Sequence, residues 1–128
     1  MPEKEIVRTE RAPAPFQGAP YNQAVKAAGL VFVAGQLGLE PSSKEPVEGI
    51  TAQTEQVMQN LRAILEEAGS GIERLVKTTV FLQDLGDFAA MNEVYAAHVG
   101  DAPPARSTVE VAKLPSGALV EIEAVALL

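Results

Sequence analysis

The feature that most constrains this fold is a pair of strand-like segments that are apolar on both faces. Residues 30–34 read Leu-Val-Phe-Val-Ala, and residues 78–82 read Thr-Thr-Val-Phe-Leu. Side chains alternate between the two faces of a strand, so runs of this kind predict strands that are covered on both sides. The fold must therefore supply cover for two faces of one sheet.

Two predicted helices supply part of this cover. Apolar residues recur at three- and four-residue steps within residues 50–68, and the Gly-Ser-Gly at 69–71 ends that segment. A second helix begins at Asp87, which suits an N-cap, and its apolar residues share one face: Phe88, Met91, Val94 and Tyr95. Further strands are predicted at residues 6–9, 22–27, 75–82, 106–113 and 118–127, with the last two joined as a hairpin by a turn at 114–117.

The resulting order, β-β-β-α-β-α-β-β, predicts an α+β domain with a mixed sheet and both helices on one face. A chain of 128 residues has the size of one domain, and no linker or repeat divides it, so residues 1–128 are expected to form a single domain. The second face of the sheet then has no cover within one chain. Together with Val125 and Leu127, this predicts a homo-oligomer whose neighbouring subunits cover that face.

Composition excludes several classes of site. The chain has no Cys, which removes disulfides, thiolate nucleophiles, zinc fingers and iron–sulfur clusters, and its one His, His98, forms no metal cluster by itself. A net charge of -7 opposes nucleic acid as a general partner. The charged N-terminus has no signal-like apolar stretch, and no apolar run approaches the roughly 20 residues of a membrane span. We expect a cytoplasmic protein with no metal site and no membrane partner.

The predicted hairpin has one polar side. Arg106, Thr108 and Glu110 share one face of its first strand, and Glu121 and Glu123 share one face of its second. These faces are expected on the same side of the sheet, with Glu110 opposite Glu121. Arg106 and Glu121 are then roughly 13 Å apart in one chain. A site that uses both residues is therefore expected to form between subunits.

Five side chains are candidates for chemistry, and each has a plainer alternative. Arg106 can hold a carboxylate with its planar fork, or it can form an ion pair with a nearby Glu. Glu121 can orient a water or take its proton, or it can lie solvated on an open strand face. Tyr21 aims its hydroxyl into a cleft or closes a turn. The position of Asn92 is typical of an exposed amide, and that of His98 of a surface residue near a helix C-terminus. None of these residues identifies a reaction by itself.

Several short segments carry a family resemblance when they are taken together. They are residues 20–24 (Pro-Tyr-Asn-Gln-Ala), 33–36 (Val-Ala-Gly-Gln), 76–81 (Val-Lys-Thr-Thr-Val-Phe), 84–88 (Asp-Leu-Gly-Asp-Phe), 91–95 (Met-Asn-Glu-Val-Tyr), 104–111 (Pro-Ala-Arg-Ser-Thr-Val-Glu-Val), 114–115 (Leu-Pro) and 121–124 (Glu-Ile-Glu-Ala). In order and spacing they resemble the RidA/YjgF family of imine deaminases, formerly labelled endoribonuclease L-PSP. The resemblance covers nearly the whole chain, and the segments around Arg106 and Glu121 are the most specific.

This resemblance implies a chorismate-mutase-like α+β fold, assembled as a homotrimer with clefts between adjacent subunits. It also implies hydrolysis of reactive 2-imino acids, such as 2-iminobutanoate and 2-iminopropanoate, to 2-oxo acids and ammonia. The carbon of a protonated imine is already electrophilic, so positioning a water and holding the anion suffice and no cofactor is expected.

The resemblance also implies roles for individual residues. Arg106 grips the substrate carboxylate, while Tyr21 and Glu121 face the imine and the attacking water. The pocket is completed by Asn92, the backbone of Gly35 and the backbone carbonyl of Thr108.

Three positions depart from the family pattern and leave the preferred substrate open. Ala34 stands where a small hydroxyl residue is usual, and Ala19 where a Gly commonly precedes the Pro-Tyr. Thr108 stands where Cys is frequent, a change that is discounted because the resemblance implies a role only for the backbone at that position.

Two other functions compete with the deaminase. One is a non-catalytic trimer that binds small carboxylates or protein partners, although anion binding alone needs Arg106 without Tyr21 and Glu121. The other is ribonuclease activity, which the acidic balance, the single His and the absence of a basic-aromatic stripe oppose.

Overall fold

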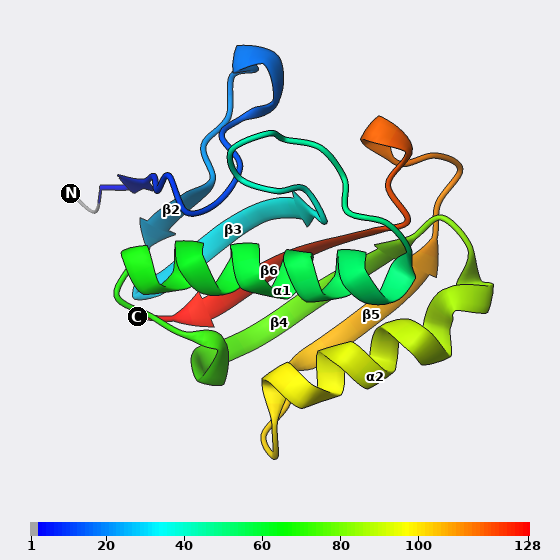
Figure 1. Cartoon of the computed structure of the whole chain (residues 1–128). Helices are drawn as coiled ribbons and strands as arrows, with labels where there is room; N and C mark the ends of the chain where they lie inside the picture. The colour runs from blue at the N-terminus through cyan, green and yellow to red at the C-terminus, as the bar shows by residue number, and fades with distance from the viewer. Residues whose placement is uncertain (1–2) are drawn as a thin grey trace.

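A six-stranded sheet forms the centre of the computed structural model, which describes residues 3–128 (Figure 1). In chain order the strands are β1 (Glu5–Val7), β2 (Ala24–Ala27), β3 (Leu30–Leu37), β4 (Leu75–Leu82), β5 (Ala105–Glu110) and β6 (Val120–Leu127). Their order across the sheet is β1-β2-β3-β6-β4-β5, and all pairs are antiparallel except β4–β5. The helices α1 (Ile50–Glu67) and α2 (Phe88–Val99) lie on one face. The predicted α+β class, mixed sheet and element order are confirmed.

The main core lies between α1 and the sheet. One stripe of α1 is fully buried, because apolar residues recur at the helical period: Val57, Leu61, Ile64 and Leu65. Alternate residues of the central strand β6 are also buried: Val120, Ile122, Ala124 and Ala126. Neither helix is long and apolar enough to cross a bilayer, within residues 3–128.

Helix α1 ends where the Gly-Ser-Gly segment predicted. Gly69 takes a φ of 87°, and the amides of Gly69 and Ser70 donate to the carbonyls of Glu66 and Leu65 at 3.0 and 2.8 Å. These two bonds form a Schellman motif, which satisfies carbonyls that the last helical turn leaves unpaired.

The predicted hairpin is wrong. Strand β5 pairs in parallel with β4, and β6 lies between β3 and β4 instead of beside β5. The reason is the crossover: β4, α2 and β5 form a strand–helix–strand unit, and a helix of this length returns the chain beside the first strand in parallel. The alternating buried residues of β6 then occupy the central position, where both neighbours pair with it.

Several boundaries also differ from the prediction. The first strand, Glu5–Val7, begins and ends earlier than the predicted range of 6–9. The second, Ala24–Ala27, begins later than the predicted range of 22–27, and the strand predicted at 30–34 extends to Leu37. Asp87 does precede α2, but its side chain makes no capping bond. Asp84 caps instead, because its Oδ1 accepts from the amide of Gly86 at the short turn before the helix.

The face without helices carries large apolar side chains in contact with solvent. Phe32 is 44%, Val109 43% and Leu127 46% exposed. Isolated exposed apolar residues are common, but these three come from three strands of one sheet face.

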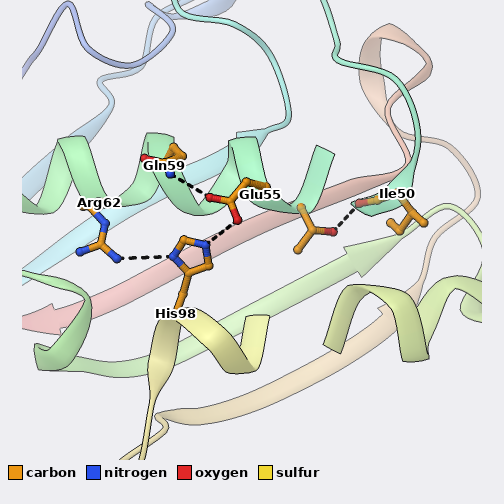
Figure 2. A network of polar contacts seen from close by, with 6 residues as sticks. Ile50, Glu55, Gln59, Arg62 and His98 are labelled. Atoms are coloured by element: carbon orange, nitrogen blue, oxygen red, sulfur yellow. Dashed lines mark hydrogen bonds and ion pairs between the residues drawn. The ribbon is translucent and has the colours of Figure 1, made fainter. Parts of the chain in front are cut away.

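A polar network joins the two helices (Figure 2). His98 of α2 donates from Nε2 to Glu55 Oε1 of α1 at 2.9 Å, and Arg62 donates to its Nδ1 at 3.4 Å. The His98 side chain is only 11% exposed, so it is a bridge between helices and not the surface residue that was predicted. Its hydrogen bond, together with one from Gln59, holds the pKa of Glu55 below the ordinary value of 4.5.

This network predicts a pH-dependent contribution to stability. Because the folded-state pKa of Glu55 is lowered, its contribution is present above about pH 4.5 and is lost as the pH falls through the folded-state value. Glu55→Gln should lower Tm at pH 7 by about 1–3 °C, and this difference should vanish near pH 3. Thermal unfolding of both proteins at the two pH values measures it, with Glu67→Gln on the same helix as the control. An equal Tm difference at both pH values contradicts the prediction.

Candidate functional site

Arg106 is a half-buried cation held between two aromatic rings. Its guanidinium carbon lies 4.8 Å from the ring centre of Tyr95 and 5.6 Å from that of Phe88, both on α2. Both distances are within the range of cation–π attraction. Arg106 forms no ion pair with any of residues 3–128, so the alternative of a structural Arg–Glu pair is not what the structure shows. Its planar fork is left free to take a carboxylate.

The Tyr95 ring is itself fixed by strand β4. Its hydroxyl and that of Thr78 are hydrogen-bonded at 2.6 Å in a buried position, and burial raises the pKa of Tyr95. Thr78 is the direct sheet neighbour of Arg106. One strand residue therefore anchors the ring on which Arg106 rests.

Two buried side-chain oxygens lie on the elements that carry Arg106 and its aromatic contacts. Asn92 Oδ1 on α2 and Thr108 Oγ1 on β5 are both buried, and neither finds a hydrogen bond among residues 3–128. Asn92 lies on the same helical stripe as Phe88 and Tyr95, four residues after one and three before the other. It is therefore not the exposed amide that its sequence context suggested. We call the set Phe88, Asn92, Tyr95, Arg106 and Thr108 the Arg106 half-site.

Glu121 on β6 belongs to a second group. Its side chain is half-buried, and burial, with a smaller contribution from the negative charge of Glu123, raises its carboxyl pKa. The backbone of Gly35 lies against this carboxylate, so closely that a Cβ at position 35 would overlap Glu121 Oε2. The pairing of β3 with β6 is irregular between Val33 and Gln36, and this bulge brings Gly35 to that position.

Tyr21 lies beside Gly35. The two residues line the same small hollow, together with Gln36. Tyr21 is 45% exposed as a residue, and its hydroxyl accepts a hydrogen bond from the amide of Phe16 at 2.7 Å. Of the two predicted readings, the turn contact is therefore present. We call Tyr21, Gly35 and Glu121 the Glu121 half-site.

The two half-sites lie on opposite faces of the sheet. Arg106 pairs with Thr78 of β4, and Glu121 pairs with Phe81 of the same strand. Paired residues point to the same face, whereas residues three apart along a strand point to opposite faces. Thr78 bonds to α2, so Arg106 is on the helix-covered face and Glu121 on the open one. The predicted common side is wrong, because β4 and not a hairpin turn relates the two strands.

Phe88 and Tyr95 were predicted only as the packing face of a helix. The signal for their second role was their seven-residue spacing around Asn92, which places all three on one stripe. Their contact with Arg106 depends on the parallel return of β5, which the hairpin interpretation left out.

Comparison with known proteins gives consistent matches along the chain. A family model described as Endoribonuclease L-PSP matches residues 9–128. A RutC family protein of Pyrococcus abyssi is 50% identical over 124 residues, covering 96% of each chain. A mouse protein named 2-iminobutanoate/2-iminopropanoate deaminase is 41% identical over 124 residues, covering 96% of this chain and 90% of the relative.

Solved structures match equally well. RidA from an Antarctic Psychrobacter has a TM-score of 0.92 and 44% identity, and the match covers 97% of this chain and 99% of the other. Escherichia coli TdcF with bound serine has a TM-score of 0.89 and 38% identity, covering 97% and 98%.

The contact between Gly35 and Glu121 predicts how a methyl group would act there. Gly35→Ala should push the Glu121 carboxylate toward water, because the new Cβ overlaps Oε2 and the side chain can turn away. The pKa of Glu121 should then fall toward the ordinary value for Glu, since burial is the main cause of its rise. Carboxyl titration by NMR measures this, and Glu121→Gln, which removes the signal, identifies it. An unchanged pKa in Gly35→Ala argues against the contact.

Proposed function

The chain belongs to the RidA/YjgF/RutC family, and on that premise we propose that it hydrolyses reactive 2-imino acids to 2-oxo acids and ammonia. Small aliphatic substrates, 2-iminobutanoate and 2-iminopropanoate, are the expected ones, and the name of the mouse relative supports this choice. The single observation that carries the proposal is the unpaired Arg106 cation in its aromatic setting.

Arg106 is proposed to bind the substrate carboxylate. A guanidinium that is partly removed from water, and that has no acid partner among residues 3–128, gains strongly from a bidentate anion. The chain as a whole carries a net charge of -7 and repels anions at long range. Capture of a small carboxylate therefore depends on this local cation.

Glu121 is proposed to activate the attacking water by accepting a proton from it. Water adds to the imine carbon as Glu121 takes one of its protons, which gives a tetrahedral aminoalcohol. Return of that proton to the nitrogen, followed by transfer of the hydroxyl proton to the Glu121 carboxylate, lets the carbon–nitrogen bond break, so that ammonia leaves and the 2-oxo acid remains. A carboxyl group whose pKa is raised by burial suits both directions of this transfer. Tyr21 and the backbone of Gly35 complete this side of the pocket.

The active site is proposed to form between subunits of a homotrimer. Within one chain the two half-sites face away from each other, so a complete site needs a second copy that brings its Glu121 half-site to the Arg106 half-site. The exposed Phe32, Val109 and Leu127 give the open sheet face an apolar surface for such a contact.

The family description endoribonuclease suggests a different substrate, RNA. The net charge of -7 opposes binding of the RNA phosphate backbone. A ribonuclease binds these phosphates with Lys and Arg, and this chain has 10 of them against 17 Asp and Glu. The proposal therefore keeps a small-molecule substrate.

The activity is tested by a coupled assay. An amino acid oxidase or threonine dehydratase generates the imine, semicarbazide traps it, and the protein should lower semicarbazone formation. Arg106→Ala should reduce kcat/KM about a thousandfold, because it removes a charge-assisted anchor. Glu121→Gln should lower kcat about a hundredfold with a smaller change in KM. Arg8→Ala, an exposed arginine outside both half-sites, is the matched control.

Two outcomes would overturn this assignment. Normal activity in Arg106→Ala removes the assigned role of that residue. A wild-type protein without effect on any amino-acid-derived imine leaves the cleft as a carboxylate-binding site, and binding of serine or a 2-oxo acid then becomes the property to measure.

The intersubunit site makes a separate prediction. Arg106→Ala and Glu121→Gln subunits should each have about one per cent of wild-type activity or less alone, but after unfolding and refolding together they should recover about a quarter of it. In a trimer with random mixing, about one cleft in four receives both intact half-sites. Mixing without refolding is the control. Recovery no greater than the sum of the two variants contradicts a shared site.

A further inference from the structure

Asn92 Oδ1 and Thr108 Oγ1 are a pair of buried oxygens without partners in the described chain. Most buried polar atoms in proteins are hydrogen-bonded, and a buried atom left without a bond lowers stability. A ligand bound beside Arg106 could therefore supply the hydrogen bonds that these two oxygens lack within residues 3–128.

Both atoms belong to the space between α2 and β5. Thr108 is two residues beyond Arg106 on β5, so both side chains point to the helix-covered face, roughly 6.6 Å apart along the strand. The chain enters α2 from the end of β4, and Tyr95 meets Thr78, the sheet partner of Arg106. Asn92 precedes Tyr95 by one helical turn, about 4.5 Å along the axis. This shift carries it from the level of Arg106 toward that of Thr108.

We propose that Asn92 Oδ1 and Thr108 Oγ1 together accept the hydrogens on the substrate nitrogen, and that the Thr108 hydroxyl thereby makes the site select a nitrogen-bearing carboxylate over the 2-oxo acid. The inference rests on the proposed function for its substrate, and it assigns a role to a side chain for which the family resemblance implies only the backbone carbonyl. The amide oxygen accepts only, and the hydroxyl oxygen can accept as well. A protonated imine carries two N–H groups, which matches two acceptors.

The 2-oxo acid does not match this pair. Its carbonyl oxygen can accept one hydrogen bond from the Thr108 hydroxyl, but it has no hydrogen to donate to Asn92 Oδ1. The ligand oxygen and Asn92 Oδ1 then face each other, and Asn92 Oδ1 stays without a hydrogen bond. The nitrogen of the imine and the oxygen of the product are nearly equal in size, and therefore shape alone separates them poorly. Hydrogen-bonding groups that one ligand satisfies and the other leaves unpaired give the larger discrimination. This difference favours departure of the product.

Binding of two stable ligands tests the inference without catalysis. 2-Aminobutanoate has an amino group, which supplies N–H donors, on the carbon atom where 2-oxobutanoate has its carbonyl oxygen. Calorimetry should give tighter binding of 2-aminobutanoate to the wild-type protein. Thr108→Val, which keeps the shape and removes the hydroxyl, should weaken 2-aminobutanoate about tenfold and change 2-oxobutanoate less than twofold. Thr108→Ser should restore the preference, and Arg106→Ala should weaken both ligands.

Asn92→Ala provides an independent variant and should reduce the same preference. Circular dichroism and Tm establish that each variant is folded. The inference is overturned if the wild type binds 2-aminobutanoate no more tightly than 2-oxobutanoate, or if Thr108→Val weakens both ligands equally, which is the sign of a structural role.

The imine assay separates this inference from the proposed function. Loss of the ligand preference in Thr108→Val, with no imine hydrolysis by the wild type, supports the nitrogen subsite and removes the deaminase. Imine hydrolysis with an unchanged preference in Thr108→Val supports the deaminase and removes the subsite.

Discussion

The alternation of side chains along β4 determines which face of the sheet each candidate site residue occupies. Strand β4 pairs with β5 on one side and β6 on the other, so its register relates Arg106 to Glu121. Thr78 and Phe81 are three residues apart, and this odd number sends their neighbours to opposite faces. A slip of one residue in either pairing would place both functional side chains on one face and bury the wrong set. The sheet register therefore places the two half-sites on opposite faces, and this is why the proposed site requires a second subunit.

The environment of Arg106 shows how an acidic chain can hold a cation against aromatic rings without an ion pair among residues 3–128. An ion pair with a neighbouring Glu would have satisfied the guanidinium and occupied its fork. The Tyr95 and Phe88 rings stabilise the charge from their faces instead, which leaves the N–H edge open. The hydrogen bond between Tyr95 and Thr78 fixes the nearer ring from the core side. A chain of contacts therefore runs from the buried Thr78 through Tyr95 to the half-buried Arg106.

Local periodicity was enough to predict the elements, but it did not predict how they pair. The α1 stripe and its glycine stop, and the strand at 75–82, follow from residues close together in sequence. The partner of β5 does not, because a turn at 114–117 is equally compatible with a hairpin and with the observed return of the chain to the sheet centre. The rule that a strand–helix–strand unit returns in parallel held the missing information. Once that pairing is known, the contact between Arg106 and Tyr95 follows.

The features that define the two half-sites all act against the stability of a single folded chain. Among residues 3–128, Arg106 has no carboxylate partner and two buried oxygens have no hydrogen bond, and burial raises the pKa of Glu121. The folded-state pKa of Glu121 lies above its unfolded value, so ionising this carboxyl at neutral pH disfavours the folded state, and the penalty disappears as the pH falls below both values. A core selected for stability alone would not collect such groups within so short a chain. Their shared property is that each can be satisfied from outside the chain: an anion for the guanidinium, N–H donors for the oxygens, and a proton for the carboxylate. A protonated 2-imino acid with an attacking water provides all of these, and this chemical match links the unsatisfied groups of the fold to the reaction proposed for it.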